Sequence, residues 1–197
     1  MTTLTMARAA PANEYDSFRS ELREIIRERS FRLGNFTLAS GRKSDFYCNL
    51  KPTMMNPRGA NLSGRAFLQV VLQTGVEYVG GLEMGAVPII ASVAAIGDIE
   101  HTPVKTFFVR KKAKEHGTRD VIEGLGPKET LDGKRVLIAD DVATTGGSIL
   151  QAIEEARRAG AIVDVALVLV DREEGATEKL AEHGVRLLSI FKANDLR

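Results

Sequence analysis

The most informative stretch of the chain reads Val136-Leu137-Ile138-Ala139-Asp140-Asp141-Val142-Ala143-Thr144-Thr145-Gly146-Gly147-Ser148. Its apolar first part predicts a buried strand over 135–139, which delivers two adjacent carboxylates at its end. The Thr- and Gly-rich loop that follows leads into a helix predicted over 147–159, and Gly160 closes that helix. A buried strand, a polar loop and a helix in this order indicate one unit of a parallel α/β sheet.

The same alternation of strands and helices continues on both sides of this unit. Further helices are predicted from Asp16 onward, from Pro57 to about Thr74 with Asn56 and Gly75 as caps, over 87–96 and over 176–182. Further strands are predicted over 76–79, 104–109, 162–170 and 185–191, whereas 36–50 is expected to be irregular with a turn at Ser40-Gly41. The fold class is therefore α/β, with a mostly parallel sheet flanked by helices.

Size and composition favour one ordinary globular domain. The chain has 197 residues, which predicts a single domain over 16–197 after a flexible tail over 1–15 that lacks the apolar region of a signal peptide. Lys and Arg total 27 against 26 Asp and Glu, a net charge of +1, so neither nucleic acid nor a membrane is an expected partner. The single cysteine, Cys48, fits a reducing compartment, and the cytoplasm is the expected location.

Four polar clusters follow predicted strands. They occupy 80–85, 110–119, 140–148 and 171–172. Because the carboxyl ends of parallel strands meet at one edge of a sheet, where ligands bind in folds of this kind, the four clusters are expected to converge there.

The cluster over 140–148 has the chemistry of a sugar phosphate site. Backbone amides and hydroxyls of its loop can surround a phosphate at a helix N-terminus. Asp140 and Asp141 would repel a phosphate, but they can accept hydrogen bonds from the hydroxyls of a ribose 5-phosphate. The alternative is a loop that is merely capped by its Asp and Thr side chains. Neither the G-x-x-x-x-G-K-[ST] nor the G-x-G-x-x-G pattern of other phosphate loops occurs.

This acidic pair and its loop resemble the type I phosphoribosyltransferases. The resemblance implies the fold of that family, with a small N-terminal hood built from approximately 16–55 plus the C-terminal strand region. It also implies that the segment binds the ribose 5-phosphate part of phosphoribosyl pyrophosphate (PRPP). The residues concerned are Asp140, Asp141, Val142, Ala143, Thr144, Thr145, Gly146, Gly147 and Ser148.

The basic run Arg110-Lys111-Lys112-Ala113-Lys114-Glu115-His116-Gly117 is similar to the R-K-x-x-K-x-H-G loop of the orotate phosphoribosyltransferase family. The resemblance implies that Arg110, Lys111, Lys114 and His116 contact PRPP. Lys114 and His116 are the expected catalytic residues, because cations that close over a departing pyrophosphate stabilise its charge. The same resemblance implies a homodimer in which loop 110–119 of one subunit completes the site of the neighbouring subunit. A solvated basic loop is the alternative.

Two further segments resemble the same family. Phe36-Thr37-Leu38-Ala39-Ser40-Gly41-Arg42-Lys43-Ser44-Asp45-Phe46-Tyr47 is similar to its hood motif, which implies that Tyr47 lies beside orotate; some members carry Lys where this chain has Ala39. Locally, a Ser-Gly turn before a strand explains this segment equally well. Cys48 lacks the sequence context of a nucleophile and is interpreted as structural.

Arg172 lies in Asp171-Arg172-Glu173-Glu174-Gly175, which is similar to the family's D-R-x-E-G motif. A guanidinium can bind a carboxylate through two hydrogen bonds, and orotate carries a carboxylate. The resemblance therefore implies that Arg172 and Thr144 contact orotate. The alternative is an arginine paired with Asp171 or Glu173 at the surface. The loop over 80–88 lies where the family has its pyrophosphate loop, but it lacks the Lys that many members have. A Gly-rich turn between a strand and a helix is the alternative.

Together these resemblances imply an orotate phosphoribosyltransferase reaction in pyrimidine synthesis: orotate and PRPP give orotidine 5′-monophosphate and pyrophosphate. Lys114, His116, Asp140 and Asp141 are the expected catalytic residues. Mg²⁺ is the expected cofactor, held mainly by PRPP phosphates and ribose hydroxyls rather than by protein ligands. Two alternatives stay open, a phosphoribosyltransferase for another base and a non-catalytic regulator that binds PRPP.

Overall fold

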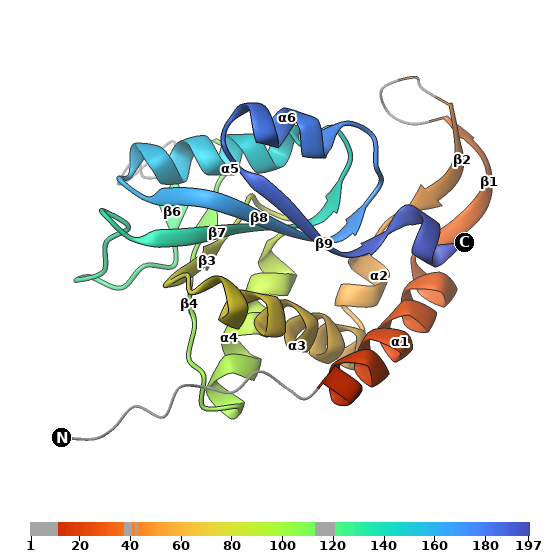
Figure 1. Cartoon of the computed structure of the whole chain (residues 1–197), viewed down its shortest axis with the longest axis horizontal. Helices are drawn as coiled ribbons and strands as arrows, with labels where there is room; N and C mark the ends of the chain where they lie inside the picture. Colours follow the sequence, from red (N-terminus) through yellow and green to blue (C-terminus); the bar gives the residue numbers. More distant parts are fainter. Residues whose placement is uncertain (1–11, 38–40, 42, 113–120) are drawn as a thin grey trace.

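A five-stranded parallel sheet forms the centre of the molecule. The computed structural model describes residues 12–37, 41, 43–112 and 121–197. The strands are β3 (Tyr78–Gly80), β4 (Lys105–Thr106), β7 (Arg135–Ala143), β8 (Ile162–Asp171) and β9 (Arg186–Lys192). They lie in the order β4-β3-β7-β8-β9, and each neighbouring pair is parallel, which confirms the expected α/β class (Figure 1).

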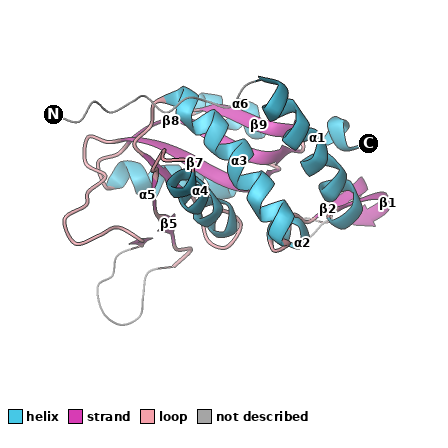
Figure 2. Ribbon diagram, turned by 90° about the horizontal axis from the view of Figure 1, so that it is seen from below, coloured by secondary structure: helices cyan, strands magenta, loops and turns pink. Residues whose placement is uncertain are grey.

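Helices cover both faces of the sheet. One face carries α5 (Gly147–Arg158) and α6 (Ala176–Glu182), and the other carries α3 (Pro57–Thr74) and α4 (Val87–Ile99) (Figures 1 and 2). Side chains of a strand alternate between the two faces. In β7, Val136 and Ile138 enter the core below α5, whereas Leu137 and Ala139 enter the core shared with α3. This explains why the strand is apolar at every position from Val136 to Ala139.

The first helix, α1 (Ala12–Arg29), packs against α3 and begins four residues before the expected Asp16. Tyr15 packs edge-on against Phe18, with ring centroids 5.2 Å apart, so the apolar stripe of this helix starts earlier than its aliphatic residues indicate. Residues 12–15 therefore belong to a helix and not to the tail predicted over 1–15. The remainder of that tail lies outside the described residues.

The segment expected to be irregular contains an antiparallel hairpin, which corrects the sequence expectation for 36–50. Its strands are β1 (Phe31–Thr37) and β2 (Lys43–Cys48), and α2 (Lys51–Met54) follows. Each strand buries a single phenylalanine, Phe31 or Phe46, and the two rings stack 5.2 Å apart. With so little buried surface, the hairpin lacks the alternating apolar pattern by which strands are recognised. It lies beyond one end of the sheet, beside the C-terminal 3₁₀ helix η1 (Ala193–Leu196) (Figure 1).

The apolar run predicted as one strand over 104–109 is divided between two sheets. Its first part is β4, and its second part, β5 (Phe108–Val109), pairs antiparallel with β6 (Ile122–Glu123). Phe107 is buried between the two parts. The β5–β6 pair flanks the basic segment, most of which (113–120) lies outside the described residues.

Candidate active site

A pocket of about 550 Å³ opens where the strand order of the sheet reverses. β3 has its successor β4 on one side and β7 on the other, so β3 and β7 form the switch point at which α/β proteins bind ligands. The described lining residues are Lys51, Leu82, Glu83, Met84, Gly85, Lys111, Asp140, Asp141, Val142 and Ser148. The structure therefore brings together the clusters over 80–85 and 140–148, with Lys111 from the start of the basic segment.

Asp140 is the buried centre of this pocket. It is 5% exposed, and its two carboxylate oxygens accept hydrogen bonds from the Asp141 backbone N–H (2.9 Å) and the Ser148 hydroxyl (2.7 Å). Burial and then the neighbouring Asp141 charge raise the pKa of Asp140 to about 7, against a smaller opposing effect of the Ser148 hydrogen bond. The acidic pair can therefore hold one proton near neutral pH without a ligand.

The 81–86 loop, which follows β3, packs directly on the acidic pair. A Cβ atom at Gly85 would lie 2.5 Å from Asp140 Oδ1 and 2.8 Å from Asp141 Oδ1, so only glycine fits there. The same loop is tied to β5: Val109 N–H donates to the Gly81 carbonyl and Glu83 N–H donates to the Val109 carbonyl, both at 2.8 Å. The loop thus holds β5 close to the carboxylates.

Glu83 is a site residue that the sequence interpretation missed. Its carboxylate accepts a hydrogen bond from the Lys111 backbone N–H at 2.9 Å, so it fixes the beginning of the basic segment at the pocket. The single acidic side chain in a glycine-rich loop was the available signal.

The loop over 144–146 leads from β7 into α5 with an open helix terminus. Gly146 adopts a left-handed conformation (φ 75°) as the N-cap residue, and no side chain from the described residues caps the helix. A Cβ atom at Gly147 would meet nothing within 4 Å among these residues. The first-turn amides and the positive end of α5 are therefore accessible to an anion, as the phosphate interpretation requires.

Arg172 joins the end of β8 to the hairpin. The side chain is buried; its Nε donates to Glu174 Oε1 at 2.7 Å and its Nη2 donates to Ser44 Oγ at 3.1 Å. The guanidinium lies 4.2 Å from the centroid of the Phe46 ring. The Arg172 backbone N–H donates to the Ala143 carbonyl at 2.9 Å, which places this residue next to the loop over 144–146.

The alternative of a surface arginine paired with Asp171 or Glu173 is thus wrong, because Arg172 is buried and pairs with Glu174. Glu173 instead accepts from Lys192, at 3.0 Å. Ser44, Phe46 and Glu174 were present in the quoted motifs, but nothing in the sequence assigned them to Arg172.

Tyr47 and Cys48 take different positions on β2. Tyr47 is 44% exposed and lies near Phe36 (ring centroids 5.6 Å apart), and neighbouring residues of a strand face opposite sides, so Phe46 and not Tyr47 contacts Arg172. Burial raises the pKa of the Cys48 thiol to about 12, partly offset by the Arg172 charge. The thiol stays protonated, which agrees with a structural role.

The other predicted cations are only partly described. Arg110 pairs with Glu123 (Nη1 to Oε1, 3.5 Å) and donates to the Lys112 carbonyl, and it is not part of the described pocket lining. Lys114, His116 and Ala39 lie outside the described residues. Lys51 was missed by the sequence interpretation; its Nζ lies 4.0 Å from Asp141 Oδ2.

The described residues offer little to hold a metal ion by themselves. No group of three or more His, Cys, Asp or Glu side chains suitable for a metal occurs among them. The adjacent carboxylates of Asp140 and Asp141 fit a cation that arrives with most of its ligands already supplied. Within the same part of the chain, none of the helices combines the length and apolar character needed to cross a membrane.

The fold and this pocket match known proteins. Residues 56–193 match the model of the phosphoribosyl transferase domain, and the chain belongs to that family. An orotate phosphoribosyltransferase of Rhodopseudomonas palustris (strain BisB18) is 52% identical over 177 residues, which cover 90% of this chain and 95% of that protein. Within the family, the chain therefore belongs with the orotate phosphoribosyltransferases.

Solved structures agree with this assignment. The Mycobacterium tuberculosis orotate phosphoribosyltransferase in complex with Fe(III) dicitrate has a TM-score of 0.77 and 35% identity, covering 91% of this chain and 98% of that chain. The complex of the Mycobacterium tuberculosis enzyme with PRPP has a TM-score of 0.73 and 32% identity, with the same coverage.

Proposed function

We propose that this protein transfers ribose 5-phosphate from PRPP to orotate, giving orotidine 5′-monophosphate and pyrophosphate. The observation that carries the proposal is the convergence of three elements at one edge of the sheet. The open loop before α5, the acidic pair Asp140-Asp141 and the buried Arg172 are joined through consecutive parallel strands. They supply recognition for a phosphate, for ribose hydroxyls and for a carboxylate, the three features that these two substrates carry.

The loop over 144–148 binds the 5-phosphate through its amides and hydroxyls. Val142 and Ala143 belong to the same binding segment at the end of β7. Asp140 and Asp141 accept hydrogen bonds from the ribose hydroxyls. The anomeric carbon becomes positively charged as its bond to pyrophosphate breaks, and an ionised carboxylate nearby offsets that charge. Most of the acceleration comes from holding the reactants in position in this electrostatic environment.

Arg172 binds the carboxylate of orotate. Glu174 and Ser44 hold the guanidinium in one orientation through the hydrogen bonds described above, so little conformational entropy is lost when orotate binds. Thr144 directly follows Ala143, the strand position at which Arg172 is anchored, and completes the base site. Tyr47 contributes to this site only if the hairpin moves, because in the structure it faces Phe36.

The basic segment neutralises the pyrophosphate. Arg110, Lys111, Lys114 and His116 contact PRPP, and Lys114 and His116 stabilise the leaving group from the neighbouring subunit of a homodimer. Arg110 must exchange Glu123 for a phosphate to do so. Mg²⁺ bound to the diphosphate and ribose hydroxyls would offset further negative charge, and Asp140 and Asp141 are the carboxylates that would lie near it. The enzyme works in the cytoplasm, where PRPP and orotate are soluble metabolites.

Orotate consumption followed by ultraviolet absorbance tests the proposal directly. Loss of orotate that requires both PRPP and Mg²⁺, and that added pyrophosphate reverses, is the expected result. Adenine, hypoxanthine and uracil should give no reaction, because they lack a carboxylate for Arg172. PRPP binding in a calorimeter without orotate consumption would contradict the proposal and favour the regulator or another base.

A further inference from the structure

The position of Lys51 in the pocket is not explained by a contribution to the stability of the folded protein. It opens the short helix α2 directly after the hairpin, and it lines the same pocket as the acidic pair and the 81–86 loop. Its side chain is 60% exposed and its Nζ lies 4.0 Å from Asp141 Oδ2. An ion pair that exposed and that long contributes little to folding. Asp141 nevertheless keeps the ammonium group at the mouth of the pocket.

The charge balance of the pocket indicates that Lys51 can contribute to binding an anionic ligand. Among its described lining residues, Lys51 and Lys111 are the basic side chains, whereas Glu83, Asp140 and Asp141 are acidic. The 81–86 loop reads Gly-Leu-Glu-Met-Gly-Ala and contains no basic residue, so it can offer only backbone amides to an anion. A diphosphate entering this lining meets no excess of positive charge, and each cation present therefore has a large effect on its binding.

We propose that Lys51 binds the diphosphate group of PRPP and of the pyrophosphate product, in place of a cation that the 81–86 loop lacks. This inference rests on the proposed function. Without ligand, Lys51 is held beside Asp141; when ribose hydroxyls occupy that carboxylate, the ammonium group turns to the phosphate oxygens.

Calorimetry with the two halves of PRPP tests this assignment. Ribose 5-phosphate probes the phosphate loop and the acidic pair, and magnesium pyrophosphate probes the diphosphate end. We expect Lys51→Ala to weaken pyrophosphate binding by about 10- to 100-fold, the loss of one charge-assisted hydrogen bond, with ribose 5-phosphate affinity within about threefold of wild type. Lys51→Arg should retain most of the pyrophosphate affinity.

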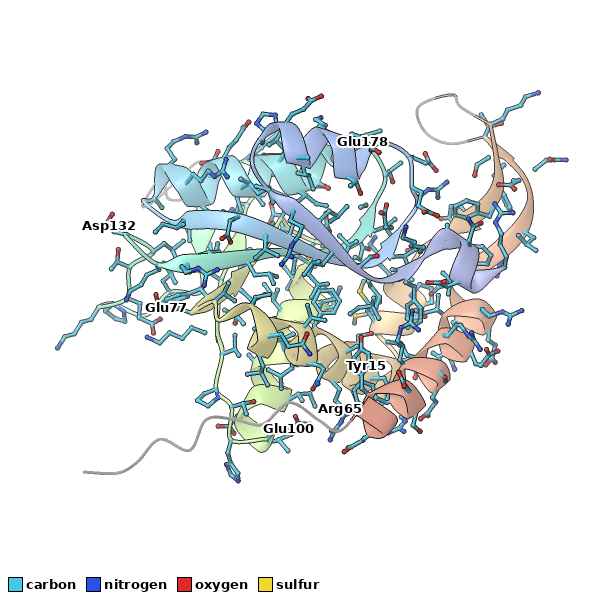
Figure 3. All side chains as sticks on the ribbon, viewed as in Figure 1. Tyr15, Arg65, Glu77, Glu100, Asp132 and Glu178 are labelled. Atoms are coloured by element: carbon cyan, nitrogen blue, oxygen red, sulfur yellow. The ribbon has the colours of Figure 1, made fainter. Side chains whose placement is uncertain are left out.

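Lys134→Ala is the matched control. It also removes one positive charge and one exposed ion pair, with Glu77 at 2.9 Å, but at the opposite end of the sheet from the hairpin, where Figure 3 labels Glu77. It should leave both affinities unchanged. Thermal unfolding of all three variants checks that each is folded.

Two outcomes would overturn the inference: unchanged pyrophosphate affinity in folded Lys51→Ala, or a loss confined to ribose 5-phosphate, which would make Lys51 a positioning residue for Asp141. In steady-state assays the inference requires a raised KM for PRPP with little change in the KM for orotate. Because calorimetry needs no turnover, a wild-type protein that failed to consume orotate would contradict the proposed function and leave this comparison of affinities intact.

Discussion

Burial changes the acid–base behaviour of Asp140 more than that of any other carboxyl group with a resolved shift. An unfolded aspartate ionises near pH 3.8, whereas burial and the Asp141 charge raise the pKa of Asp140 to about 7. Between these two pH values the folded state holds a proton that the unfolded state has lost. The free energy of unfolding therefore falls as the pH rises from about 4 to about 7 and stays lower above that range.

Asp140→Asn should remove this pH-dependent loss. We expect the free energy of unfolding of the unliganded variant to equal that of wild type near pH 4 and to exceed it by up to about 4 kcal/mol above pH 8. The variant should also lose catalytic activity. Urea unfolding at a series of pH values measures the difference. Asp16→Asn, at an exposed position on α1, is the control. A gain that did not vary with pH would show that repacking, and not ionisation, is responsible.

Arg172→Ala should weaken orotate binding by about 10- to 100-fold and leave PRPP affinity within about threefold, because a charge-assisted carboxylate contact is lost. Arg172→Lys should not restore it, since an ammonium group cannot reproduce the planar guanidinium. Orotate affinity measured by calorimetry and the KM for orotate report the effect.

Ser44→Ala separates this role from a structural one. It removes the hydrogen bond between Arg172 and the hairpin but keeps the guanidinium. A change of about fivefold or less is expected in orotate affinity, because Glu174 still holds the guanidinium. An effect of Ser44→Ala as large as that of Arg172→Ala would mean that the arginine acts by fastening the hairpin.

At the scale of single elements, the 81–86 loop shows how a backbone shapes the pocket. Its glycines permit contacts that side chains would prevent: a Cβ atom at Gly81 would lie 2.1 Å from the Ala139 carbonyl oxygen, and one at Gly85 would lie 2.5 Å from Asp140 Oδ1. The loop is thereby seated on the end of β7, and its hydrogen bonds to Val109 carry β5 with it.

Gly85→Ala should displace this loop from the acidic pair. We expect PRPP affinity to fall by about tenfold or more, because the carboxylates and the loop amides no longer fit one substrate, and stability to fall by about 1–3 kcal/mol from overpacking. Calorimetry with PRPP and urea unfolding measure the two effects. In Gly126→Ala the new methyl group meets only the end of the Glu129 side chain, at 3.3 Å, so this control should bind PRPP normally. Normal binding by Gly85→Ala would show that the loop adapts without cost.

At the scale of the whole molecule, the basic segment begins at the pocket, where the Lys111 backbone N–H donates to the Glu83 carboxylate. β5 and β6, which precede and follow residues 113–120 in the sequence, pair in a two-stranded sheet of their own, separate from the five-stranded sheet. If Lys114 acts in the neighbouring subunit of a homodimer, a defect in the segment and a defect in the acidic pair can be carried by different subunits.

Mixed dimers of Lys114→Ala and Asp141→Ala subunits should regain activity that neither variant has alone. Each mixed dimer contains one intact site, so random exchange should restore about one quarter of wild-type activity. The measurement is orotate consumption after the two variants are dissociated together and reassociated, with each variant treated alone as the control. No recovery in mixed dimers confirmed by differential tagging would place Lys114 in its own subunit's site.

Much of the fold followed from local patterns. The apolar run before Asp140 and the caps of α3 predicted strand and helix correctly, because burial on both faces and helix capping each require particular residue types within a few sequence positions. The Asn56 side chain accepts from the Gly59 N–H at 3.1 Å, as its position before Pro57 indicated. The hairpin escaped prediction because each of its strands buries only one side chain. The division of the run over 104–109 into two strands escaped prediction because β6, the partner of its second part, lies beyond the basic segment in the sequence.

The sequence by itself determined the α/β class, the glycine-rich loop that follows the acidic pair, and the candidate arginine, since contiguous residues create these features. Only the tertiary structure decided which side chains act together. Arg172 meets Ser44 across 128 residues of sequence, Lys51 approaches Asp141 from the base of the hairpin, and burial moves the pKa of Asp140 toward neutrality. Desolvation and charge interactions depend on neighbours brought together by folding, and no local pattern records those neighbours.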